Sequence, residues 1–164
     1  MSIFSTCDFC DAHKADASAA FRVLPGGAFR NYGGITQFSG PVTTVKCCED
    51  NSLVKAAVES AGQGRVLVVD GAGSLQRALL GGSLAGAAAK NGWAGLLING
   101  AVRDLAELAA AQVGILALGH VPLPTDRKSQ GTADVAVQIQ GVWIRPGDWL
   151  YADADGVVVM EKPA

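Results

Sequence analysis

The stretch GGSLAGAAAKNGWAGLLINGAVRD, residues 81–104, is the part of this sequence that decides the expected fold. A glycine pair opens an alanine-rich run at residues 83–90, which predicts a short helix. The apolar run at residues 93–98 then predicts a strand that is buried on both faces. Arg103 and Asp104 follow, so we expect them in a loop at the end of this strand, facing the start of the helix.

The predicted helix start and strand end together indicate a binding site for a small anion. Backbone N–H groups at a helix N-terminus attract a carboxylate or a phosphate. A guanidinium beside a carboxylate can hold an anion and a metal ion at one place. The glycine pair, Arg103 and Asp104 are therefore the candidate functional residues.

A purely structural interpretation of the same residues stays open. Asp104 and Glu107 fit a capping box, in which Asp104 caps the helix that follows and Glu107 closes the cap. A glycine pair before a helix is also typical of an ordinary turn. Only the spacing that brings helix start and strand end together favours the functional interpretation.

Length and composition indicate one globular domain over residues 1–164, because the chain is long enough for a sizeable core and short for two domains. Apolar residues make up 49% of the chain and charged residues 17%, which is typical of a compact protein and not of a disordered one. The net charge is −2 and the 13 Lys and Arg residues form no basic run, which argues against direct binding of nucleic acid.

The N-terminal residues MSIFSTCDFCDAHKAD lack the basic and apolar regions of a signal peptide, and no segment has the ~20 apolar residues that cross a membrane. A cytoplasmic protein is expected.

Cys7, Cys10, Cys47 and Cys48, with His13, could in principle bind zinc. The neighbours Cys47 and Cys48 end a strand-like run and should point to opposite faces, so reduced thiols are the favoured interpretation.

Upstream of the central stretch, the pattern predicts two helices and three strands. Helices are expected at residues 5–20 and 53–61, and strands at residues 33–38, 42–45 and 65–70. The turn Asp70-Gly71-Ala72-Gly73-Ser74 resembles a nucleotide or S-adenosylmethionine site only weakly. It has no third glycine, and the next strand ends in Asn99-Gly100 without an acidic residue for a ribose.

Downstream, a helix is expected at residues 105–112 and a strand at residues 115–118, followed by a loop at residues 119–124 and a polar, mobile segment at residues 125–134. His120, in that loop, is left out of the catalytic set because a loop histidine more often serves a hydrogen bond. Four antiparallel strands are expected at residues 135–139, 142–144, 146–150 and 157–160. A βαβαβ centre flanked by such strands predicts a mixed α/β fold.

The whole pattern resembles the RraA-like family, which comprises the regulator of ribonuclease E activity A and the class II 4-hydroxy-4-methyl-2-oxoglutarate aldolases. The similarity covers residues 32–160, with VVDGAGS before the central stretch and PGDWLYADADGVVV after it. It implies a swivelling β/β/α fold, a homotrimer with sites at subunit interfaces, and a divalent metal, Mg²⁺ or Mn²⁺.

The resemblance also implies roles for individual residues. The backbone of Gly81, Gly82, Ser83 and Leu84 would bind the carboxylate of a pyruvyl group. Arg103 would pair with that carboxylate and the keto oxygen, and Asp104 would hold the metal. The implied reaction is the metal-dependent cleavage of 4-hydroxy-4-methyl-2-oxoglutarate to two pyruvates, and oxaloacetate decarboxylation would pass through the same enolate.

Two departures from the aldolase pattern affect this expectation. Many aldolases carry Asp where this chain has Gly82, and longer members supply an acidic residue from a C-terminal extension of a neighbouring subunit. Glu107, one helical turn after Asp104, could partly replace them near the metal. An Asp introduced at position 82 is expected to raise metal affinity or turnover. The alternative function is that of an inhibitor that docks on ribonuclease E and modulates RNA decay.

Overall fold

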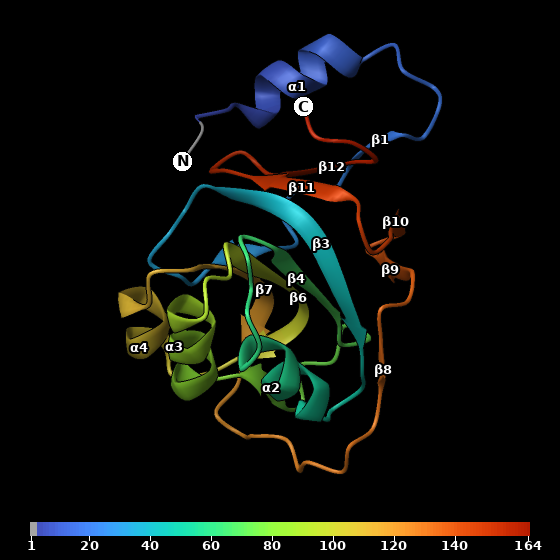
Figure 1. Ribbon diagram of the computed structural model, residues 1–164. Coiled ribbons are helices and arrows are strands. Elements are labelled where there is room, and N and C mark those ends of the chain that lie inside the picture. Colours follow the sequence, from blue (N-terminus) through green and yellow to red (C-terminus); the bar gives the residue numbers. More distant parts are fainter. Residues whose placement is uncertain (1–2) are drawn as a thin grey trace.

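The computed structural model describes residues 3–164 and shows four layers (Figure 1). The helix α1 (Thr6–His13) lies outside an antiparallel group of strands, a mainly parallel group lies behind these strands, and further helices cover the opposite face. Buried side chains fill each of the spaces between these layers. The predicted fold class, a mixed α/β domain of the swivelling β/β/α type, is confirmed.

The parallel group forms the centre of the molecule. Its strands, in spatial order, are β3 (Phe38–Lys46), β4 (Val66–Asp70), β6 (Gly95–Val102) and β7 (Gly114–His120). The helices on its outer face are α2 (Ser52–Val58), α3 (Gly82–Lys90) and α4 (Leu105–Ala110). Every residue of β6 is buried, as expected for an apolar strand covered on both faces. The predicted βαβαβ centre is therefore confirmed.

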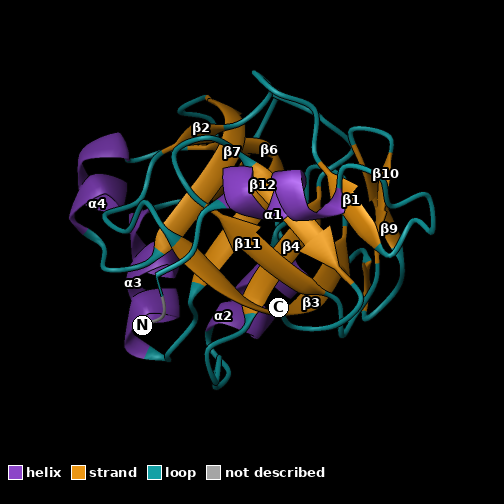
Figure 2. Ribbon diagram, turned by 90° about the horizontal axis from the view of Figure 1, so that it is seen from above, coloured by secondary structure: helices purple, strands orange, loops and turns teal. Residues whose placement is uncertain are grey.

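The antiparallel group joins this centre through β3, which belongs to both groups. The first half of β3 pairs with β11 (Trp149–Ala152) up to Pro41, and the second half pairs with β4 from Val42 onward. β11 continues to β12 (Val157–Met160) and then β1 (Phe21–Val23). Figure 2 shows α1 lying across β11 and β12.

The remaining strands are short and lie at edges or turns. They are β2 (Arg30–Asn31), β5 (Ala78–Leu80), β8 (Thr132–Ala133), β9 (Val137–Ile139) and β10 (Val142–Ile144). β9 and β10 form a separate hairpin, and β8 pairs with the end of β3. Of the helices in residues 3–164, none is long and apolar enough to cross a membrane.

The expected strands at residues 33–38 and 42–45 are wrong as two separate strands. β3 runs unbroken through Pro41, because the missing N–H of proline falls where β3 changes partners. Residues 33–37 form no ladder. Gly33 and Gly34 instead press against the backbone between α4 and β7, where a side chain at either position would overlap a carbonyl oxygen.

Other elements were expected with different lengths. α1 ends at His13 instead of residue 20, since Asp16 and Ser18 form a turn and Ala19 has a positive φ of 64°. β6 extends four residues beyond residue 98, because Ala101 and Val102 still pair with β5 and β7. The side chain of buried Asn99 is satisfied by Gln140 (3.0 Å) and Asp70 (3.4 Å). α4 ends at residue 110 instead of 112, and β7 extends to His120.

Candidate functional site

The end of β6 and the start of α3 meet as the sequence predicts. Oδ2 of Asp104 accepts a hydrogen bond from the backbone N–H of Gly82, the first residue of α3, at 2.8 Å. The backbone N–H of Arg103 donates to the carbonyl of Leu80 at 2.9 Å, just before the glycine pair. These two bonds hold Arg103 and Asp104 beside the N-terminus of α3.

This geometry corrects the capping-box interpretation of Asp104. Asp104 does stand at the N-cap position of α4, but its side chain makes no capping hydrogen bond there. Its backbone has φ 60° and ψ 52°, a left-handed conformation that non-glycine residues adopt at a cost. The carboxylate therefore turns away from its own helix and caps α3 instead.

Glu107 brings a second carboxylate to the same place. A Cβ atom at Gly82 would overlap the carboxylate of Glu107, so the glycine at position 82 is what gives this side chain its room. Gly81 is similarly confined, because a Cβ there would lie 2.8 Å from Oδ2 of Asp104 and 3.3 Å from Nε of Arg103. The carboxylates of Asp104 and Glu107 consequently both lie against the start of α3.

A small hollow of about 130 Å³ opens at this point. Five of the predicted site residues line it: Gly81, Ser83, Leu84, Arg103 and Asp104. Gly82 and Glu107 are not among the lining residues. Gly82 holds Asp104 in place through its hydrogen bond, and Glu107 packs against Gly82. The carbonyl of Gly81 accepts the N–H of Ala85, so the amides before Ala85 have no acceptor within α3, and that of Gly82 is bound to Asp104.

The hollow also contains residues that sequence reasoning missed, chiefly Asn51, Thr125 and Arg127. Asn51 stands at the N-cap position of α2, yet its side chain makes no capping hydrogen bond there. Its Nδ2 donates to the carbonyl of Leu79 at 3.1 Å, and its Oδ1 accepts from Oγ1 of Thr125 at 2.7 Å. A polar residue just after β3, at the same sheet edge as Arg103, was the available signal.

Asp50 anchors the segment after residue 124, which was expected to be polar and mobile. Its carboxylate accepts hydrogen bonds from the backbone amides of Ser52 (2.9 Å), Lys128 (2.7 Å) and Gln130 (3.3 Å). Burial alone would raise the pKa of Asp50, but a hydrogen bond from the Ser52 hydroxyl (2.6 Å) and these backbone bonds outweigh burial and hold the pKa at about 2. The segment is thereby tied to the start of α2, next to the hollow.

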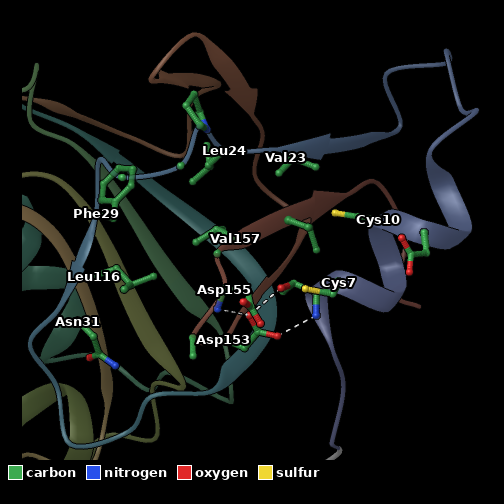
Figure 3. Close-up of a pocket in the computed structure, with 18 residues that line it drawn as sticks. Cys7, Cys10, Val23, Leu24, Phe29, Asn31, Leu116, Asp153, Asp155 and Val157 are labelled. Carbon is green, nitrogen blue, oxygen red and sulfur yellow. Dashed lines mark hydrogen bonds between the residues drawn. The ribbon is translucent and has the colours of Figure 1, made fainter.

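A larger hollow, about 530 Å³, lies elsewhere, between α1, residues 23–29 and the β11–β12 turn (Figure 3). Asp153 accepts two hydrogen bonds from Thr6 there, which attach α1 to the turn. The lining of this hollow includes Asp11, Asp153 and Asp155 but no Lys, Arg or His. Such a negative hollow suits an anionic ligand poorly, so size does not identify the functional site here.

The four cysteines lie as free thiols in different environments. Cys47 is buried in the core and Cys48 is exposed, which confirms that the two point to opposite faces. Burial raises the pKa of Cys47 to about 12, and the charge of Asp155 raises the pKa of Cys7. Within residues 3–164, no three His, Cys, Asp or Glu side chains are grouped as metal ligands.

The two weaker sequence signals have structural explanations. Gly71 packs where a side chain would contact Leu79 and the backbone of Asn99, and the amides of Gly71 and Gly73 both donate to Asn99 at 3.1 Å. Gly71 is therefore required for close packing, whereas Gly73 has open space around it and a positive φ of 72° that suits glycine. His120 forms a hydrogen bond with the Tyr32 hydroxyl at 3.1 Å.

Comparison with known proteins matches residues 6–159 to the family described as Aldolase/RraA. The chain belongs to the RraA-like family. A relative from Albidiferax ferrireducens, named "Putative 4-hydroxy-4-methyl-2-oxoglutarate aldolase", is 64% identical, and the match covers 95% of this chain and 94% of the relative. The predicted resemblance is thus confirmed.

Two solved structures share the fold over almost the whole length of both chains. The RNA-processing inhibitor RraA from Thermus thermophilis has 40% identity and a TM-score of 0.92, with 99% of this chain and 96% of that chain covered. A Geobacillus kaustophilus protein described as an S-adenosylmethionine:2-dimethylmenaquinone methyltransferase has 44% identity and a TM-score of 0.90, with 98% and 96% covered.

Proposed function

We propose that this protein is a divalent-metal-dependent aldolase that cleaves 4-hydroxy-4-methyl-2-oxoglutarate into two pyruvates and also decarboxylates oxaloacetate. The observation that carries the proposal is the bond from Gly82 to Asp104, which gathers Arg103, Asp104 and the start of α3 around one hollow. The name of the Albidiferax relative supports the same activity.

The start of α3 is suited to the pyruvyl carboxylate of the substrate. The free amides of Ser83 and Leu84, together with the positive end of the helix, attract an anion. Arg103 also lines the hollow and can donate two parallel hydrogen bonds to the carboxylate and the adjacent keto oxygen. Together these groups would hold the 2-oxo acid end of the substrate.

The acidic side chains at this point fit a magnesium or manganese ion. Asp104 and Glu107 offer only oxygen atoms, which these ions prefer, and one oxygen of Asp104 is already fixed by Gly82. A bound ion would act as a Lewis acid that stabilises negative charge on the keto oxygen while the C3–C4 bond breaks. Arg103 would stabilise the same charge from the protein side.

Exposed apolar side chains near the hollow support a homotrimer with sites at its interfaces. Leu105 follows Asp104 and is 40% exposed, and Leu123 precedes Pro124 in the lining and is 49% exposed. Large apolar side chains that border a polar site commonly mark an interaction surface.

The test of the proposed activity is pyruvate release from 4-hydroxy-4-methyl-2-oxoglutarate and from oxaloacetate, measured with Mg²⁺ or Mn²⁺ and after EDTA treatment. We expect release from both substrates with either ion and loss of release after EDTA, restored by adding the ion. A purified protein that releases no pyruvate with either ion would contradict the proposal.

The second candidate function is docking on ribonuclease E as an inhibitor. It is favoured by the similarity to the RNA-processing inhibitor from Thermus thermophilis. The net charge of −2 per chain is too small to cover a basic RNA-binding surface by charge alone. The test measures RNA cleavage by purified ribonuclease E in the presence of EDTA-treated wild-type protein or of an Arg103 variant. Because both lack the proposed catalytic activity, inhibition by either would show that docking does not depend on catalysis.

A further inference from the structure

Two arginines line the hollow at the start of α3. Arg103 comes from the end of β6, and Arg127 comes from the segment that follows β7. Arg103 and the start of α3 together suffice for one carboxylate. Arg127 also lines this hollow of about 130 Å³, so one more positive side chain is available to bind a second anionic group.

Arg127 is held by a contact that leaves its terminal amino groups free. Its Nε donates to Oδ1 of Asn51 at 3.1 Å, and Asn51 is only 7% exposed. Asn51 is itself fixed by its bond to the carbonyl of Leu79. Across residues 3–164, neither an ion pair nor a further hydrogen bond engages the Nη atoms of Arg127.

The backbone that carries Arg127 is fixed on both sides. Upstream, Nη1 of Arg77 donates to the carbonyl of Pro124 at 3.0 Å, and Oγ1 of Thr125 donates to Asn51. Downstream, the buried carboxylate of Asp50 accepts from the amide of Lys128. A side chain mounted on a braced segment loses little entropy when it binds a ligand, which favours a role in recognition.

We propose that Arg127 binds a second carboxylate of the substrate and makes the site selective for 2-oxo dicarboxylates over 2-oxo monocarboxylates. This inference rests on the proposed function, because the first carboxylate must lie against α3 and Arg103. The side chains lining the hollow carry two positive charges and one negative charge, Asp104. A substrate with two carboxylates matches the two guanidinium groups, whereas a monocarboxylate leaves Arg127 without an anion.

The kinetic test compares two substrates that differ only in the second carboxylate. They are 4-hydroxy-4-methyl-2-oxoglutarate and 4-hydroxy-2-oxopentanoate, which carries hydrogen in place of the C4 carboxylate. We expect Arg127→Gln to lower kcat/KM for the dicarboxylate about 10- to 100-fold, as for loss of a hydrogen bond between charged groups, and to change the monocarboxylate less than about threefold. Arg127→Lys should recover part of the loss because it keeps the charge.

Lys128→Gln is the matched control, since it removes one positive charge from the adjacent residue, which lines a different hollow. Its expected effect on the ratio of kcat/KM for the two substrates is less than about twofold. An equal loss on both substrates with Arg127→Gln would mean that Arg127 only supports the fold. An unchanged ratio would overturn the inference as well.

A binding measurement separates failure of this inference from failure of the proposed function. Titration calorimetry with Mg²⁺ compares 2-oxoglutarate with 2-oxopentanoate, neither of which can undergo the aldol cleavage. We expect Arg127→Gln to weaken 2-oxoglutarate about tenfold or more and to leave 2-oxopentanoate within about threefold. If the protein gives this result but releases no pyruvate, the role of Arg127 in selectivity stands and the proposed aldolase activity is rejected. If the wild-type protein binds 2-oxoglutarate and 2-oxopentanoate with equal affinity, only the inference about Arg127 is rejected.

Discussion

The carboxylate of Asp104 accepts a hydrogen bond from the backbone N–H of Gly82 across 22 positions of sequence. This bond connects the end of a fully buried strand to the start of a helix, so it fixes both sides of the candidate site. A carboxylate at a helix N-terminus is also stabilised by the helix dipole. Asp104 therefore has a structural partner through Oδ2 while its other oxygen stays available to a ligand.

The first prediction separates these two roles of Asp104. Asp104→Ala should abolish metal-dependent pyruvate formation, and loss of the bond to Gly82 should cost about 1 kcal/mol of stability, as for other helix caps. Asp104→Asn keeps an acceptor for Gly82, so it should retain the wild-type Tm and still lose activity. Melting temperature and decarboxylation rate are measured on the same samples. Wild-type rates in folded Asp104→Ala protein would favour the ribonuclease E alternative.

The second prediction concerns the planar fork of Arg103. Arg103→Lys keeps a positive charge but cannot grip a carboxylate and a keto oxygen together. We expect kcat/KM to fall on the order of 10²-fold or more, with little change in Tm because the side chain bonds only weakly to the carbonyl of Pro122, at 3.5 Å. Steady-state kinetics with oxaloacetate measure this loss. If kcat/KM of Arg103→Lys stays within a fewfold of the wild-type value, Arg103 does not take part in the reaction.

The third prediction tests whether Glu107 takes the place of an acidic residue at position 82. Glu107→Gln should weaken Mg²⁺ binding about 10- to 100-fold, as expected for a side chain that supports a metal ligand. Gly82→Asp alone, which the family pattern predicts to be beneficial, should instead lower stability, because the new side chain overlaps Glu107.

The double variant Gly82→Asp with Glu107→Ala provides the control, since it exchanges one carboxylate for another in the same space. We expect it to recover metal affinity relative to Glu107→Ala alone. Metal titration by calorimetry and thermal melting are the two measurements. Stable Gly82→Asp protein with unchanged affinity would contradict the placement of Glu107.

The fourth prediction follows from the depressed pKa of Asp50. A carboxylate whose pKa is about 2 in the folded state and near 3.8 when unfolded contributes stability above about pH 4, and this contribution disappears as pH falls from 3.8 through 2. Asp50→Asn should therefore lower Tm by several degrees at pH 7, since a hydrogen bond to a charged group is worth about 1.5–3 kcal/mol. The difference from wild type should shrink below pH 4. A difference that is constant from pH 7 to pH 2 would contradict this.

The fifth prediction is the oligomeric state. Light scattering at micromolar concentration should give three times the chain mass of 16.7 kDa. Leu123→Glu, which places a charge on an exposed apolar side chain beside the hollow, should shift the protein toward smaller species. A wild-type mass equal to one chain would reject both the trimer and a site shared between subunits.

The sequence by itself determined the central elements of this protein. The apolar run before Arg103 predicts a strand buried on both faces, and the alanine-rich run before it predicts a helix, because hydrophobic pattern and helix propensity are local properties. Their connection alone places Arg103 and Asp104 near Gly81 and Gly82. The family resemblance rests on these residues together with the motifs VVDGAGS and PGDWLYADADGVVV on either side, and the match over residues 6–159 confirms it.

Only the tertiary structure decided which partners these residues have. The D-x-x-E pattern predicts that Asp104 caps α4, but a left-handed backbone turns its carboxylate to Gly82 instead. Asn51 and Arg127 stand far from Arg103 in sequence, and they reach the hollow because α2 and the segment after β7 begin at the same edge of the sheet. Such contacts depend on the order of the strands in space, which no local pattern of residues contains.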